Sequence, residues 1–137
     1  MAKQTKNNIQ TVGKRKTSVA RATIVKGKGL LKINNQSPEE YFTNELVKLR
    51  VKEPLLISDY GDKFDIAINV FGGGINSQAD ATRQAIARAL VEITGNEDLR
   101  KQFIDYDRTL IVADTRFKEM KKPNNSSARA KRQKSYR

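Results

Sequence analysis

Three consecutive glycines, Gly72, Gly73 and Gly74, stand directly before an alanine-rich stretch with the periodicity of a helix. A glycine-rich helix start can bind phosphate, because the helix presents free N–H groups and partial positive charge while the glycines allow an anion to come close. Two nucleotide-binding motifs are nevertheless incomplete. A P-loop requires Lys where Gln78 stands, and a dinucleotide fingerprint requires a third glycine where Ser77 stands. The glycines therefore predict either an anion-docking loop or a tight strand-to-helix turn.

Few other side chains could carry out catalysis. The chain has no Cys and no His, which excludes thiolate nucleophiles, imidazole bases, disulfides and the usual zinc sites. Asp105, Asp107 and Asp114 could form an acid/base or metal cluster, but the first two flank an apparent helix end and are better explained as turn residues. No activated nucleophile accompanies them. We therefore predict that the chain is not an enzyme, with no metal site, no cofactor and no small-molecule substrate.

The charge is concentrated at the two ends of the chain. The net charge is +12, with +5 in residues 1–16, −1 in residues 17–115 and +8 in residues 116–137. A nearly neutral centre with two basic ends predicts a polyanionic partner. A membrane is not expected, because the C-terminal segment has no apolar face and no apolar run is long enough to span a bilayer. We expect a soluble, intracellular protein without a secretory signal.

The composition predicts three segments. Residues 1–12 are polar and are expected to be a mobile arm. Residues 13–115 have the length and apolar content of one globular domain. Residues 116–137 contain few apolar side chains and a turn-prone Pro-Asn-Asn-Ser-Ser centre, so we expect an extended basic tail that becomes ordered on a partner.

Within the domain, period-two alternation predicts two strands. The stretch from Thr17 alternates Ala20, Ala22 and Ile24 with the residues between them, and a Gly-containing turn at 26–29 predicts that residues 17–34 form one hairpin. The stretch 64–70 alternates more cleanly and is the clearest strand. A short apolar run at 110–113 predicts a further buried strand.

Helix signals alternate with these strands. Ser37-Pro38-Glu39-Glu40 has the form of a capping box, and Pro54 is expected to end or kink the helix, leaving 55–57 as a separate buried run. Ser77 is expected to cap the next helix, which ends near Gly95 with Gln84 and Arg88 pointing away from the core. A second helix is expected over 97–106. The order of elements predicts a two-layer α/β (α+β) fold.

Five separated stretches follow one another at a characteristic spacing: GKRKTSVARATI (13–24), EEYF (39–42), FGGGINSQADATRQAIARAL (71–90), LRKQFIDYDRTLIVADTR (99–116) and ARAKRQKSYR (128–137). Together they resemble the family of small-ribosomal-subunit protein nine. The resemblance covers nearly all of the chain after residue 12. KEPLLI (52–57) and the terminal KSYR (134–137) look like its archaeal and eukaryotic cytosolic branch.

The resemblance implies a globular part similar to the second domain of small-subunit ribosomal protein five, with helices on one face of a four-stranded sheet. It implies a structural, cytoplasmic role in the head of the small ribosomal subunit, beside neighbouring head proteins and bound to small-subunit ribosomal RNA. The RNA contacts it implies are Lys14, Arg15, Lys16, Arg21, Gly72, Gly73, Gly74, Arg83, Lys121, Lys122, Arg129, Lys131, Arg132 and Lys134. The tail would reach the peptidyl-site transfer RNA, with Tyr136 and Arg137 nearest to it.

One stretch departs from the family pattern. Residues 123–127, Pro-Asn-Asn-Ser-Ser, replace a glycine-rich link, and Asn is the residue there that best tolerates left-handed backbone geometry. The sequence leaves two alternative functions open. One is a phosphate-ester enzyme that uses the glycine loop, and the other is a nucleic-acid chaperone that is not part of a particle.

Overall fold

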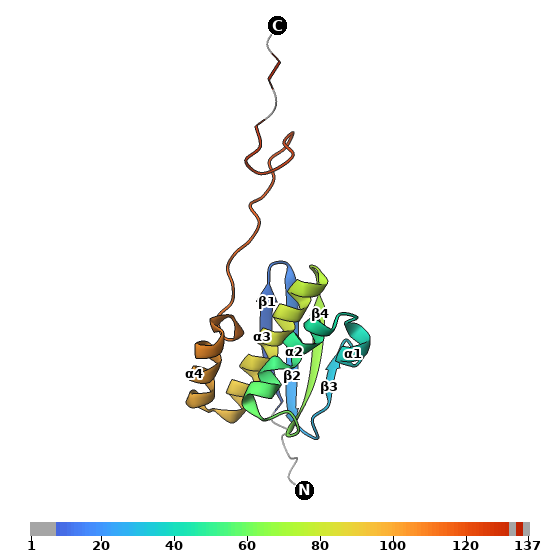
Figure 1. The fold of residues 1–137 in the computed structure, drawn as a ribbon, viewed down its shortest axis with the longest axis vertical. Helices are drawn as coiled ribbons and strands as arrows, with labels where there is room; N and C mark the ends of the chain where they lie inside the picture. Colours follow the sequence, from blue (N-terminus) through green and yellow to red (C-terminus); the bar gives the residue numbers. More distant parts are fainter. Residues whose placement is uncertain (1–7, 132–133, 136–137) are drawn as a thin grey trace.

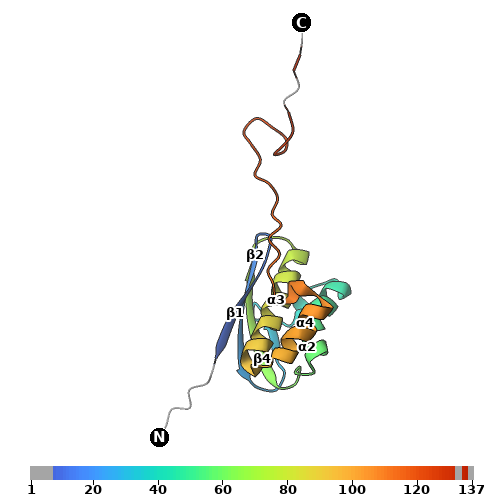
Figure 2. The same ribbon diagram turned by 90° about the vertical axis from the view of Figure 1, so that its left-hand side faces the viewer.

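Four strands form one mixed sheet within the residues that the structure, a computed structural model, describes: 8–131 and 134–135 (Figure 1). They are β1 (Ile9–Arg15), β2 (Ser18–Lys26), β3 (Leu31–Ile33) and β4 (Phe64–Phe71), in the order β1-β2-β4-β3 across the sheet. β2 is antiparallel to β1 and β4, whereas β3 is parallel to β4. The helices lie on one side of the sheet (Figure 2), so the predicted two-layer class is confirmed.

β1 corrects one boundary that the sequence predicts. The sequence predicts an arm that extends to residue 12, but β1 begins at Ile9 and pairs with β2 along its whole length. Thr11 and Gly13 are buried against helix α3 (Ile75–Thr94), and the Thr11 hydroxyl donates to the Ala85 carbonyl at 2.8 Å. The segment is polar in composition, but it forms a strand because its two inward-facing residues, Thr11 and Gly13, are small enough for α3 to pack against them.

The predicted hairpin over 17–34 is wrong. β2 pairs with β1 across the turn Lys16-Thr17, and β3 lies on the far side of β4. The loop before β3 is held against β4 by Asp65, whose carboxylate accepts the N–H groups of Lys28 and Leu30 at 2.8 and 2.9 Å. These bonds direct the chain across the end of β4 instead of back along β2.

Two helices connect β3 to β4. α1 (Pro38–Tyr41) has the predicted capping box, in which the Ser37 hydroxyl accepts the Glu40 N–H and the Glu40 carboxylate accepts the Ser37 N–H. α2 (Glu45–Ser58) runs through Pro54 and ends at Asp59, which has a left-handed φ of 53°. The predicted helix end and the separate run at 55–57 are therefore wrong. The Pro54 ring is buried, and this packing offsets the backbone hydrogen bond that proline cannot make.

α3 packs directly on the sheet, and its small alanines are buried there. The approach is close: a Cβ on Gly13 would lie 2.0 Å from the Ala81 carbonyl oxygen and 2.7 Å from the Ala85 nitrogen. α3 ends at Gly95, which has a left-handed φ of 62° and confirms the predicted stop. The buried core lies between α3 and the inward faces of the strands.

Gln84 and Arg88 do not point away from the body as predicted. Gln84 is buried and accepts the Lys14 N–H while donating to the Thr109 carbonyl. Arg88 donates to the carbonyls of Val12 and Ile111. A helical wheel shows only the residues of one helix, so it does not include these backbone partners. The hydrogen bonds connect α3 to β1 and to the segment after α4.

α4 (Glu97–Tyr106) has the predicted bounds. The predicted strand at 110–113 is wrong, because the 3-10 turn η1 (Arg108–Leu110) begins where Asp107 accepts the Thr109 N–H, and only Leu110 of the run is buried. From Thr115 onward the described residues form neither helix nor strand (Figure 1).

Candidate nucleic-acid interface

Three segments that are far apart in the sequence meet at one end of the sheet (Figure 1). They are the β1–β2 turn (residues 14–18), the start of α3 with the glycines before it (72–75), and the beginning of the C-terminal segment (114–116). The Ser18 hydroxyl donates to the Gly72 carbonyl at 2.9 Å, and Arg15 lies 3.2 Å from Asp114. We call this region the hairpin end. It brings together the basic β1–β2 turn, the three glycines and the start of the basic C-terminal segment.

Two of the three glycines are required by the fold itself. Gly72 and Gly73 have φ values of 77° and 65°, which side chains rarely adopt. A Cβ on Gly72 would lie 2.6 Å from the Thr17 carbonyl oxygen, and one on Gly73 would lie 2.1 Å from the Ser18 hydroxyl. The tight-turn interpretation therefore accounts for Gly72 and Gly73.

Gly74 is different, because it has a negative φ and no atom lies within 4 Å of a Cβ built on it. It is the N-cap of α3, and no side chain caps the helix there. The predicted cap at Ser77 is wrong by three residues, since α3 already begins at Ile75. The first turn of α3 contains no acidic side chain, so its partial positive charge is left open at an exposed position.

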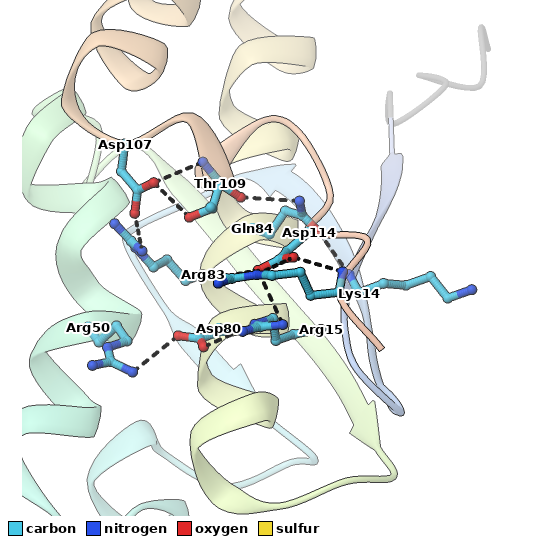
Figure 3. Close-up of a pocket in the computed structure, with 10 residues that line it drawn as sticks. Lys14, Arg15, Arg50, Asp80, Arg83, Gln84, Asp107, Thr109 and Asp114 are labelled. Carbon is cyan, nitrogen blue, oxygen red and sulfur yellow. Dashed lines mark hydrogen bonds and ion pairs between the residues drawn. The ribbon is translucent and has the colours of Figure 1, made fainter. Parts of the chain in front are cut away.

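A pocket of about 270 Å³ lies beside the hairpin end, between β1, α2, α3 and the C-terminal segment (Figure 3). Five basic residues, three carboxylates and two uncharged residues line it: Lys14, Arg15, Arg50, Arg83, Arg116, Asp80, Asp107, Asp114, Gln84 and Thr109. One carboxylate oxygen of Asp80 lies 3.2 Å from a guanidinium nitrogen of Arg50, and the other lies 3.8 Å from the Arg15 Nε atom. The carboxylates thus separate the guanidinium groups and hold α2, α3 and β1 together, while the lining keeps an excess of positive charge.

Asp114, weighed above as a possible acid/base residue, is an ion-pair partner in the structure. Hydrogen bonds from the Arg116 side chain and backbone, with a smaller effect of the Arg15 charge, hold the pKa of the Asp114 carboxyl well below its ordinary value. A carboxylate that is ionised in this way cannot supply a proton near neutral pH. Its role is to join the C-terminal segment to the domain.

Arg83, which the resemblance implies as an RNA contact, points into the body. Its guanidinium group forms ion pairs with Glu53 of α2 and, at 2.8 Å, with Asp107 after α4. Its side chain is only 11% exposed. This geometry assigns Arg83 to the fold, where it links three helices, and Arg15 is engaged by carboxylates in the same manner.

Lys14, Lys16 and Arg21 lie at exposed positions. Figure 3 shows the Lys14 ammonium group directed away from the ion pairs of the pocket. Arg21 projects from the face of the sheet opposite the helices, with its guanidinium carbon 5.7 Å from the centroid of the Phe71 ring. Phe71 and Lys32 are also exposed on this face, and the sequence does not predict either of them as a contact. The period of two that passes through Asp65, Ala67 and Asn69 could have identified Phe71 as outward-facing.

The C-terminal segment carries most of the remaining predicted contacts. Five of the predicted contacts in it are described and exposed: Lys121, Lys122, Arg129, Lys131 and Lys134. Asn124 adopts a left-handed φ of 64°, a backbone geometry that Asn tolerates better than most residues. The Arg129 side chain donates to Glu119 at 2.8 Å. Arg132, Tyr136 and Arg137 lie outside the described residues.

Within the described part of the chain, no group of three or more His, Cys, Asp or Glu residues is arranged to hold a metal ion. None of the helices there combines the length and the apolar character that a membrane span requires.

Comparison with known proteins gives a consistent result. The family model described as "Ribosomal protein S9/S16" matches residues 13–137. "Small ribosomal subunit protein uS9" of Methanococcus maripaludis is 48% identical over 132 residues, covering 94% of this chain and 98% of that protein. The protein of the same name from Thermoplasma volcanium is 48% identical over 130 residues, with the same two coverages. These organisms are archaea, in agreement with the branch that the KEPLLI and KSYR stretches indicate. The chain belongs to the ribosomal protein S9/S16 family.

Proposed function

We propose that the chain is a structural component of the small ribosomal subunit that binds ribosomal RNA through its hairpin end and its basic C-terminal segment. One observation carries this proposal. At the hairpin end, exposed Lys14 and Lys16 and the uncapped start of α3 lie beside the beginning of the C-terminal segment, which is rich in Lys and Arg. Lys and Arg side chains and helix N-termini are among the groups that proteins use to bind phosphates. A non-catalytic role agrees with membership of a ribosomal-protein family.

The contacts divide into two classes. Lys14, Lys16 and Arg21 are exposed and available to phosphates, and Gly74 leaves room for an RNA backbone at the α3 N-terminus. Arg15 and Arg83 act indirectly, because their ion pairs position the hairpin and the helices that present the other groups. Gly72 and Gly73 are likewise needed for the shape of the turn.

The C-terminal segment supplies the longest-range attraction. Residues 118–137 carry eight basic side chains and one acid, a net charge of +7. Such a segment binds by releasing counterions from phosphates, which makes its affinity strongly dependent on salt. Small residues among the basic ones, such as Ala128 and Ala130, keep the chain narrow enough to pass between RNA helices.

The finer placement rests on the family resemblance and on this charge. We propose that the domain lies in the head of the subunit in the cytoplasm, beside other head proteins. The C-terminal segment reaches the peptidyl-site transfer RNA with Tyr136 and Arg137, a ring that can stack and a cation that can pair with phosphate.

A salt titration tests the RNA-binding role. Binding of a small-subunit ribosomal RNA fragment is measured for the full chain and for a variant that lacks residues 118–137. This variant retains the hydrogen bond from Arg116 to Asp114. If each of the seven net charges meets a phosphate, the slope of log affinity against log salt should fall by about 5 to 6 on deletion. An equal slope for the two proteins would contradict the proposal. Sedimentation with the small subunit at high salt separates an integral component from a free chaperone.

A further inference from the structure

The face of the sheet opposite the helices is uncovered in the described part of the chain (Figure 2). Side chains at alternate positions of the four strands project from it, and the strand register places them in rows. Lys14, Val19 and Phe71 form one row, and Val12, Arg21 and Asn69 form the next. A third row contains Gln10, Thr23, Ala67 and Lys32. We call these ten residues the open face.

The open face is cationic. It contains Lys14, Arg21 and Lys32 and no carboxylate, and the one acid in the four strands, Asp65, lies beyond its third row. The Asp65 carboxylate is already bound by two backbone N–H groups. The charge of this surface therefore complements a polyanion.

The open face also has an aromatic centre. Phe71 is 51% exposed, and the Arg21 guanidinium group lies over its ring. Exposed aromatic rings and Arg guanidinium planes on a sheet are surfaces on which unpaired bases stack. Asn69, Thr23 and Gln10 add amide and hydroxyl groups that can donate and accept hydrogen bonds at base edges.

We propose that the open face binds an unpaired stretch of RNA, with one base stacked on Phe71 and adjacent phosphates held by Arg21 and Lys14. The proposal deepens the RNA-binding function above, on which it rests, by naming a second surface and the kind of RNA that it binds. A duplex does not fit this surface, because its bases are stacked within the helix and cannot reach a ring. A protein partner fits less well, since interface cores are depleted of Lys while this face presents two lysines and one arginine.

The absence of tryptophan allows a direct test on the full chain. Phe71→Trp introduces a single fluorophore at the proposed stacking position, and Leu49→Trp places one at a similarly exposed position on α2. Each variant is titrated with an oligouridylate of about 12 nucleotides, a length that single-strand-binding folds cover. The emission of Phe71→Trp should be quenched saturably by the oligouridylate, and that of Leu49→Trp should stay unchanged. A duplex of equal length should quench neither variant.

Affinity measurements complete the test. Phe71→Ala should weaken oligouridylate binding by roughly 5-fold or more, as loss of one stacked base does elsewhere. Arg21→Ala should in addition lower the salt slope by about 0.7. Leu56→Ala, an exposed substitution on α2, is the control that should change neither quantity.

The outcomes separate the two proposals. If the full chain binds neither the oligouridylate nor a small-subunit ribosomal RNA fragment, the RNA-binding function itself fails. If the chain binds RNA while the Phe71→Trp emission and the Phe71→Ala affinity stay unchanged, only the open-face proposal is overturned. Shielding of the introduced tryptophan in assembled subunits, without quenching by free RNA, would also overturn it and would indicate a protein neighbour.

Discussion

Arg15 and Asp114 lie 3.2 Å apart, and this ion pair joins the turn between β1 and β2 to the first residues of the C-terminal segment. Asp114 also accepts a hydrogen bond from Arg116 at 2.7 Å, and Arg15 lies 3.8 Å from Asp80 of α3. The basic segment therefore starts from a point that the globular part holds in place. Its first contacts are made with the protein, whereas Lys121, Lys122, Lys131 and Lys134 further along it lie at exposed positions.

The Asp114 ion pairs should make stability depend on pH. The lowered native pKa means that the unfolded chain binds the proton more tightly, so the stabilisation is complete above the unfolded pKa of about 4 and is lost as pH falls toward the native pKa. The melting temperature of the natural chain should consequently fall more steeply between about pH 5 and pH 2 than that of Asp114→Asn. Asp105→Asn, at an exposed position, is the control; parallel curves for all three proteins would contradict the prediction.

Gly74 allows the stability of α3 to be separated from RNA binding. Its backbone conformation suits an N-cap side chain and the space around it is open, so Gly74→Asp should stabilise the protein by a few tenths of a kcal/mol. The same carboxylate should repel an approaching phosphate and weaken RNA binding. Gly74→Ser supplies a cap without charge and should retain affinity. Denaturant unfolding and RNA titration of both variants check the prediction, which fails if Gly74→Asp binds RNA as tightly as Gly74→Ser.

Gly13→Ala should destabilise the fold, because the new Cβ would overlap backbone atoms of Ala81 and Ala85. Helix α3 would have to move away from β1, at a cost of about 1–3 kcal/mol or more. Gly61→Ala is the matched control, since no atom lies within 4 Å of its Cβ position. Urea unfolding should show a lower midpoint for Gly13→Ala and an almost unchanged one for Gly61→Ala.

Arg83→Ala should lower stability without changing the salt dependence of RNA binding. The substitution leaves the Glu53 and Asp107 carboxylates near the core without their partner, at a cost of roughly 1–3 kcal/mol. Arg100→Ala removes a more exposed ion pair with Glu97 and should be close to neutral. Urea unfolding measures the first effect and salt titration the second. A reduced salt slope for Arg83→Ala would restore this residue to the RNA contacts.

Removal of Tyr136 and Arg137 alone should leave subunit assembly close to normal. These residues carry one aromatic ring and one charge, a small part of the basic segment. Affinity of assembled subunits for peptidyl-site transfer RNA should change, because a base or phosphate contact is lost. Filter binding of transfer RNA to subunits with the full and shortened chains measures the effect. Equal transfer RNA occupancy would contradict the proposed reach of the segment.

The features that the sequence predicts correctly depend on neighbouring residues. The capping box at Ser37 and Glu40 is made by two residues in one helical turn, and the alternation along 64–70 is a property of one strand. α4 and the end of α3 at Gly95 follow from local caps in the same way. The family resemblance rests on the order of such local motifs, and the matching family model confirms it.

The features that the sequence does not predict depend on distant partners. Thr11 and Gly13 form a strand because α3 lies against them, and β3 leaves its predicted partner because Asp65 holds the loop. Arg83 resembles any other basic residue until Glu53 and Asp107 are brought beside it. No local pattern could distinguish this arginine from one that binds RNA.

The sequence by itself determined the nearly neutral centre, the two basic ends and the family, since composition and local motifs do not require a fold to be known. The tertiary structure decided which charges are available. Ion pairs engage Arg15 and Arg83 within the protein, whereas Lys14, Lys16 and Arg21 remain exposed. The physical reason is that a charge binds a partner only where its own chain leaves it solvated and unpaired, and this depends on contacts between residues far apart in the sequence.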